Sequence, residues 1–122
     1  MDTYFRTESL TIKEIRASDY PVITKPITLA AGQNLPEGAV LGKITKVGEA
    51  DIGKCVLSVA AATDGSEKAY AVLTYAVDAT AAAKKATAYF AGDFVGKNLT
   101  YGAGHDKDSV FDDLRNGGVY VI

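Results

Sequence analysis

The sequence is poor in the residues that build disulfides and metal sites. Its 122 residues include one cysteine, Cys55, and one histidine, His105. A lone cysteine excludes a disulfide within the chain and suits a reducing compartment. A lone histidine without nearby cysteines or histidines is a weak basis for a zinc site. We therefore expect no metal and no other cofactor.

Large core-forming side chains are also scarce. The chain has no tryptophan and one methionine, whereas Ala, Val, Tyr and Gly are prominent. A single domain of this length buries about two-thirds of the surface that its unfolded chain exposes. A core of small side chains gives a fold little reserve of stability, so the burial of further apolar surface between subunits would stabilise it.

The chain lacks an excess of positive charge and a long apolar run. Thirteen basic and 15 acidic residues give a net charge of −2. No basic stripe is present, which argues against a nucleic-acid partner. No apolar run is long enough to cross a bilayer, and Met1–Leu10 has no apolar signal region. We expect neither nucleic acid nor a membrane as a partner.

The first 26 residues differ in character from the rest. They mix charges, Thr and Ser with scattered apolar residues, and end at two prolines. We interpret residues 1–26 as a flexible or extended arm. An alternative is a short helix packed on the body, since Thr11 and Glu14 could form a capping box. The candidate binding residues of the arm are Tyr4, Phe5, Leu10, Ile12 and Ile15.

The adjacent aromatics Tyr4 and Phe5 have two interpretations. An aromatic pair in a mobile segment is typical of a binding anchor. Equally, both rings could fold back onto the body. The sequence leaves these two alternatives open.

Residues 27–122 carry strand and turn chemistry. Alternating and continuous apolar runs predict strands over 39–47, 54–62, 70–77, 87–95, 98–101 and 119–122. The run at 70–77 is apolar enough to predict burial on both faces. The Ala-rich link over 78–85 could hold a helical turn, and Gly42 predicts a bulge or a close backbone approach.

A helix is predicted near the C-terminus, over 107–115. Asp106 or Asp108 is placed to cap it, and Gly117 to end it. Its buried face would consist of Val110, Phe111 and Leu114. The carboxylates of Asp106, Asp108, Asp112 and Asp113 suit the start of a helix better than a calcium loop, because apolar residues interrupt their spacing.

No catalytic cluster is evident. A hydrolase or transferase needs a nucleophile beside a base, or a tuned acid–base pair. His105 lies in a Gly-rich polar stretch and is interpreted as an exposed loop residue, while Cys55 alternates with Leu57 and Val59 as a buried, unreactive thiol would. A carboxylate-dependent activity at Asp64 or Asp93 would revive the hypothesis of an enzyme. We expect no enzyme and no catalytic residues.

Several short motifs occur in a specific order along the body. They are Gly38-x-x-Leu41-Gly42, Asp64-Gly65-Ser66, Ala71-Val72-Leu73, Val77-Asp78-Ala79-Thr80 and Tyr89-x-x-Gly92-x-Phe94. In this order and spacing, from Ile27 to Ile122, the chain resembles the phage lambda head decoration protein family. The arm does not match by residue.

The resemblance implies a mainly β fold of β-clip type, a small α+β body with one short C-terminal helix and an extended N-terminal arm. It divides the chain into a flexible capsid-binding arm, 1–26, and a β-rich decoration domain, 27–122. It implies a homotrimer that binds the major capsid protein outside the expanded icosahedral capsid, at three-fold and quasi-three-fold positions. Such proteins stabilise the shell against internal DNA pressure. The implied location is the outer virion surface, after synthesis in the host bacterial cytoplasm.

One alternative function stays open at this point. Seven tyrosines could stack on sugars, as in a non-enzymatic carbohydrate- or receptor-binding β domain of a phage structural protein. Tyr70, Tyr75 and Tyr89 fall in predicted strands, where packing in a core or an interface explains them better. An enzyme is the weakest of the three hypotheses.

Overall fold

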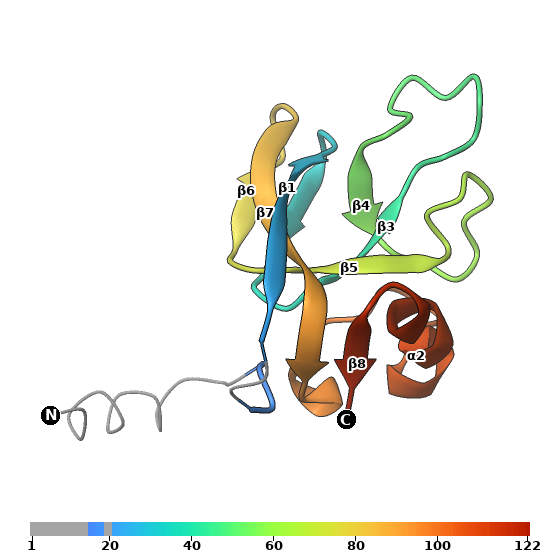
Figure 1. The fold of residues 1–122 in the computed structure, drawn as a ribbon. Coiled ribbons are helices and arrows are strands. Elements are labelled where there is room, and N and C mark those ends of the chain that lie inside the picture. Colours follow the sequence, from blue (N-terminus) through green and yellow to red (C-terminus); the bar gives the residue numbers. More distant parts are fainter. Residues whose placement is uncertain (1–14, 19–20) are drawn as a thin grey trace, which may run out of the picture.

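A computed structural model describes residues 15–18 and 21–122 (Figure 1). The protein is mainly β, with one short helix near its C-terminus, as predicted. The strands are β1 Ile23–Leu29, β2 Gln33–Leu35, β3 Val40–Lys43, β4 Cys55–Leu57, β5 Ala69–Leu73, β6 Val77–Ala79, β7 Lys84–Phe94 and β8 Val119–Val121. A 3₁₀ helix, η1 (Gly96–Asn98), and the α-helix α2 (Lys107–Asn116) lie between β7 and β8.

The main sheet closes into a small barrel. Its strand order is β1-β4-β3-β5-β7-β8, and β1 also pairs with β7. β1 and β7 pair antiparallel along the length of β1, whereas β1 and β4 meet only at Leu29 and Cys55. β8 continues the sheet in parallel with the end of β7, and β2 and β6 form a separate pair. The barrel is therefore closed tightly on the β7 side of β1 and loosely on its β4 side.

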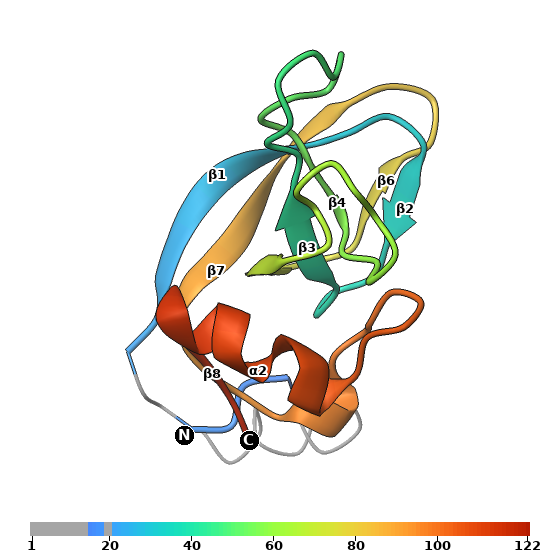
Figure 2. The ribbon, with the colours of Figure 1, turned by 90° about the vertical axis from the view of Figure 1, so that its right-hand side faces the viewer.

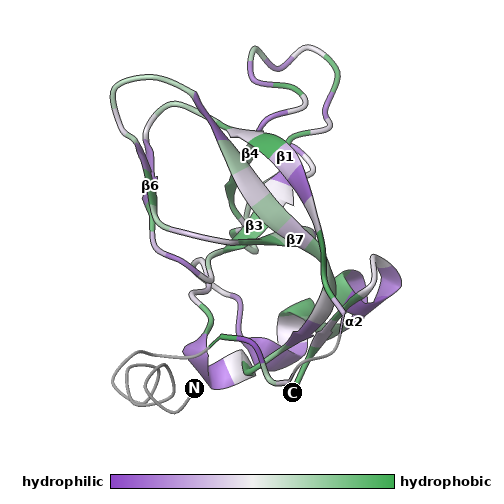
Figure 3. Cartoon of the chain, turned by 60° about the vertical axis from the view of Figure 1, so that its left-hand side comes forward, coloured by the Kyte–Doolittle hydropathy of each residue, from purple (hydrophilic) through white to green (hydrophobic). Residues whose placement is uncertain are grey.

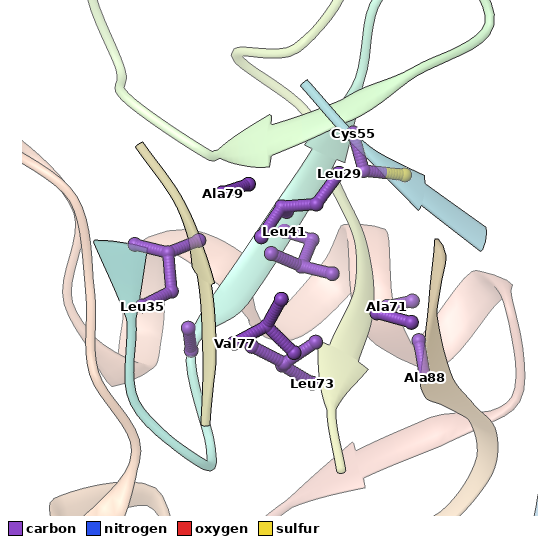
Figure 4. Packing of buried hydrophobic residues seen from close by; sticks show 11 residues of the cluster. Leu29, Leu35, Leu41, Cys55, Ala71, Leu73, Val77, Ala79 and Ala88 are labelled. Atoms are coloured by element: carbon purple, nitrogen blue, oxygen red, sulfur yellow. The ribbon is translucent and has the colours of Figure 1, made fainter. Parts of the chain in front are cut away.

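Two hydrophobic cores lie on opposite sides of the sheet. The barrel core contains Leu29, Leu41 and Leu73, which converge between the strands in Figure 4. The helix-side core contains Phe94 and residues of α2, which runs beneath the sheet next to β8 (Figure 2). Hydrophobic residues accordingly follow β7, which borders both cores, and part of α2 (Figure 3).

Burial on both faces holds for only part of the strand predicted over 70–77. Ala71 and Leu73 point into the barrel core and Val72 into the helix-side core, as alternation along a strand requires. Tyr70 and Tyr75 are exposed, however, and the strand ends at Leu73. The apolar run therefore overstated both the length and the burial of this strand.

Other predicted elements also differ from the structure. β3 and β4 are shorter than predicted, and residues 98–101 form the end of η1 and an isolated bridge rather than a strand. The Ala-rich link over 78–85 holds no helical turn. It contains the last two residues of β6 and the start of β7, because pairing with β2 and β1 outweighs the helix propensity of alanine.

The helix was predicted closely. Asp106 is its N-cap: its carboxylate accepts a hydrogen bond from the Ser109 amide at 2.8 Å, and the Ser109 hydroxyl accepts one from the Asp106 amide at 2.8 Å. Val110 and Leu114 are fully buried. The left-handed residue after the helix is Gly118, with φ of 103°, and not Gly117, whose φ of −91° is ordinary.

Gly42 fulfils the expectation of a bulge and a close approach. The register of β3 against β5 shifts between Leu41 and Gly42. A Cβ added at Gly42 would lie 1.9 Å from the carbonyl oxygen of Ser66. Any side chain at this position would therefore push the 64–67 turn away from the barrel.

Candidate functional site

The described residues of the predicted arm lie against the body. The Ile15 carbonyl accepts a hydrogen bond from the Val95 amide at 2.7 Å, and the Ala17 amide donates to the Asp93 carbonyl at 3.1 Å. The Ile15 side chain is 4% exposed and belongs to the helix-side core. The chain then enters β1 at Ile23. Residues 15–18 and 23–26 thus run along β7, so the body begins well before the boundary at residue 26.

Of the five candidate arm residues, the structure places one. Tyr4, Phe5, Leu10 and Ile12 lie outside the described residues, and their part in binding stays a prediction. Ile15 is held in the helix-side core, so its side chain anchors the N-terminal segment to the body. A direct contact of Ile15 with a partner would require it to leave this core.

The prediction of an exposed His105 was wrong. The ring is half-buried, and its Nε2 lies 2.9 Å from the Glu67 carbonyl oxygen and 3.2 Å from the Ser58 hydroxyl. Its Nδ1 lies 2.9 Å from the Ser109 hydroxyl. His105 therefore ties the start of α2 to the segments that follow β4 and precede β5. Its Gly-rich neighbours gave no sign of these contacts, because all but one of its partners are distant in sequence.

The Ser58–His105 pair is structural rather than catalytic. Ser58 is fully buried, and its hydroxyl donates to the Ser66 carbonyl at 2.7 Å. The other nitrogen of His105 meets a hydroxyl and not the carboxylate that orients the base of a catalytic triad. No substrate could reach this serine without opening the fold.

Asp64, Asp78 and Asp93 accept side-chain hydrogen bonds. Asp64 accepts hydrogen bonds from the amide and hydroxyl of Ser66 at 3.0 and 2.5 Å, and these bonds lower the pKa of Asp64. Asp78 accepts from Thr80 in the same way, which lowers the pKa of Asp78. Asp93 accepts a hydrogen bond from the Ser18 hydroxyl at 2.9 Å. Asp64 and Asp93, the two carboxylates considered for an activity, are thus both engaged in hydrogen bonds, Asp64 within its own turn and Asp93 with the N-terminal segment.

Cys55 is buried, as predicted. Burial raises the pKa of its thiol to about 11, and the nearby charge of Lys43 only partly offsets this effect. A neutral, inaccessible thiol is a poor nucleophile. Within residues 15–18 and 21–122, no three His, Cys, Asp or Glu side chains gather as a metal site would require. No helix in this part of the chain is both long and apolar enough to cross a bilayer.

An open groove of about 340 Å³ lies where β1 diverges from β4. Its lining residues are Lys25, Pro26, Ile27, Thr28, Lys43, Gly53, Cys55, Tyr70, Lys85 and Phe90. Tyr70 and Phe90 meet edge to face, with ring centroids 5.2 Å apart. The Nζ atom of Lys43 lies 5.4 Å from the Tyr70 centroid, and that of Lys25 lies 5.7 Å from the Phe90 centroid. We call this feature the lysine groove.

Little in the sequence points to the lysine groove. Its three lysines come from three different strands, and only the barrel brings them together. Lys85 pairs across the sheet with Thr28, and Lys43 with Cys55. Along the chain, Lys85 is adjacent to Lys84 and far from the other two lysines of the groove.

The loop between β3 and β4 presents an unusual apolar surface. This loop, residues 44–54, projects from the barrel at the upper right of Figure 1. Val47 is 88% exposed and Ile52 is 48% exposed. Glu49, also exposed, lies between them in the chain. We call residues 47–52 the apolar loop.

Comparison with known protein families identifies a match that covers most of the chain. A family model described as "Bacteriophage lambda head decoration protein D" matches residues 7–116, nearly the whole chain. No match was found among curated proteins.

Proposed function

Because the chain belongs to the bacteriophage lambda head decoration protein D family and is therefore a structural, capsid-associated protein of a phage head, we propose how it acts there. It binds as a homotrimer to the outside of the expanded icosahedral capsid, at three-fold and quasi-three-fold positions. There it contacts the major capsid protein and stabilises the shell against internal DNA pressure. The family match over residues 7–116 is the observation that carries this proposal.

The N-terminal segment supplies the attachment to the coat. An extended segment adds to an exposed strand edge through main-chain hydrogen bonds, and its alternate side chains fix the register. In this proposal Tyr4 and Phe5 are the aromatic anchors, and Leu10 and Ile12 fit the coat surface. Ile15, held in the helix-side core, transmits load from the arm to the body.

Trimerisation makes weak arms effective. Ordering an extended segment costs conformational entropy, so one arm alone binds weakly. Three arms on one rigid trimer make the second and third contacts intramolecular, which raises avidity by about 10²–10⁴. Coat subunits that separate under pressure would then have to break several contacts together. The mechanism needs no chemical step.

Sedimentation with purified heads tests the proposal. Wild-type protein is mixed with expanded and with unexpanded heads, and light scattering gives its mass in solution. We expect about three subunits per particle and co-sedimentation with expanded heads. A protein that sediments with neither form at any salt concentration would not be a decoration protein in the sense proposed here.

A deletion of residues 1–14 tests the arm separately. It removes the candidate residues Tyr4, Phe5, Leu10 and Ile12 but spares the buried Ile15. We expect the deletion to leave the trimer and the melting temperature unchanged and to abolish head binding. Substitution of both Tyr4 and Phe5 by alanine should weaken binding to a smaller extent. Full decoration by the deleted protein would show that the body alone attaches to the capsid.

A further inference from the structure

The lysine groove holds positive charge that the described chain does not neutralise. Among residues 15–18 and 21–122, the ion pairs are Lys54 with Asp51 and Arg115 with Asp112. Lys25 and Lys43 face aromatic rings, and Lys85 stands on the strand opposite Thr28. The groove thus combines a positive rim with an apolar floor formed by Phe90, Tyr70 and Ile27.

The edge of β1 in the groove is unsuited to an added strand. The Ala30 amide donates to the Cys55 carbonyl, so the backbone groups of Thr28 and Pro26 point to the same side, toward the groove. Proline has no amide hydrogen and interrupts a hydrogen-bonded ladder at an edge. An occupant of the groove therefore has to dock through side chains, as a loop does, rather than through its backbone.

The apolar loop has the matching properties. It projects from the body, and its two apolar side chains are exposed, Val47 almost completely. Glu49 supplies a negative charge between them and has no ion pair among the described residues. The apolar side chains of the loop would contact the aromatic and aliphatic side chains of the groove, and the Glu49 carboxylate would contact its lysines.

In one copy, the apolar loop lies next to the lysine groove but does not enter it. Gly53, directly after the apolar loop, forms one wall of the groove, yet Val47 stays in solvent. A projection and a recess that do not meet within one molecule can pair head to tail between copies, and such a contact closes into a ring when the rotation between copies allows it. A three-fold ring uses one such contact per copy.

We propose that the apolar loop of one copy inserts into the lysine groove of the next copy, and that this contact builds the homotrimer. The inference rests on the trimer of the proposed function and names the surfaces that form it. It adds the burial between subunits that a core of small side chains would benefit from.

Two variants with complementary defects test the contact. The loop variant carries Val47→Asp and Ile52→Asp and keeps an intact groove. The groove variant carries Lys25→Glu, Lys43→Glu and Lys85→Glu and keeps an intact loop. Matched controls are Ile122→Asp, at an exposed apolar residue elsewhere, and Lys68→Glu, Lys97→Glu and Lys107→Glu combined, at three exposed lysines outside both the groove and the loop.

Sedimentation velocity of each protein, alone and mixed, gives the readout. We expect each variant alone to be monomeric, with association weakened at least tenfold, while the control variants remain trimeric. An equimolar mixture of the two variants should form dimers, since one intact loop can enter one intact groove. Such dimers also show that both variants are folded.

The remaining outcomes overturn the inference. Variants that stay trimeric place the subunit interface elsewhere. A groove variant that stays trimeric but no longer binds heads shows that the groove takes an acidic segment of the coat instead. A mixture that contains no dimers also contradicts the contact. The proposed function is tested separately, by head binding of the wild-type protein. That test does not depend on the results for the variants.

Discussion

The two hydrophobic cores differ in how they are closed. The helix-side core is covered by α2 and β8, and Ile15 completes it, so that Phe94, Val110 and Leu114 are fully buried. The barrel core is filled with Ala, Val and Leu side chains and opens between β1 and β4, where Phe90 is only half-buried beneath lysines. The chain covers the helix-side core completely, whereas the lysine groove leaves the ring of Phe90, at the edge of the barrel core, partly exposed.

The largest effect that we expect is a difference in stability between two alanine variants. One replaces Phe94 in the helix-side core, and the other replaces Phe90 at the lysine groove. Phe94→Ala should lower the free energy of unfolding by about 3–5 kcal/mol, because a fully buried ring leaves a cavity. Phe90→Ala should cost less than half of that in the monomer, since its ring already faces the groove. Urea unfolding measures both. Equal losses would mean that the open end is as tightly packed as the closed one.

The second prediction concerns the N-terminal segment. Ile15→Ala should cost about 2–5 kcal/mol, the range for a buried isoleucine. Ile23→Ala, at a side chain that is 54% exposed, should change stability by no more than about 0.5 kcal/mol. Thermal unfolding of the two variants shows whether residue 15 belongs to the body. If the Ile15→Ala variant were as stable as wild type, residue 15 would belong to the arm and not to the body.

The third prediction uses pH and the thiol beside the groove. The folded pKa of Cys55, about 11, lies above the ordinary thiol pKa of 9.0, so its neutral form stabilises the fold below pH 9 and this contribution is lost as pH rises through 11. The stability of wild type relative to Cys55→Ala should fall by about 2 kcal/mol between pH 8 and 11. A pH-independent difference would show that water reaches the thiol through the groove.

The smallest expected effect lies at the start of α2. Asp106→Ala removes the cap and should cost about 1 kcal/mol. Asp108→Ala removes only a first-turn charge and should cost about 0.3–1 kcal/mol, less at high salt. Chemical denaturation at two salt concentrations separates the two contributions. Loss of the same size and salt dependence at both positions would contradict the capping role of Asp106.

Local features were predictable from the sequence. The helix, its cap at Asp106 and the burial of Val110 and Leu114 depend on residues within a few positions of one another. The mainly β class likewise follows from short apolar runs and turn residues. Gly42 could be singled out because a glycine inside a strand signals a close approach.

Features that depend on distant residues were missed. The prolines Pro21 and Pro26 suggested an arm, yet Pro26 lies within β1, where its position at an open edge tolerates the missing amide. His105 looked like a free loop residue because its partners Ser58 and Glu67 lie across the fold. The lysine groove exists only once three strands meet.

Electron cryomicroscopy of expanded heads mixed with this protein is the most informative single measurement. It shows whether the N-terminal segment beside the helix-side core attaches to the coat while the lysine groove joins neighbouring copies. We expect trimers on the outer surface at three-fold positions, with chain continuing from Ile15 into the coat and each apolar loop in the next copy's lysine groove. Isolated single copies, or trimers whose N-terminal segments do not touch the coat, would contradict this expectation.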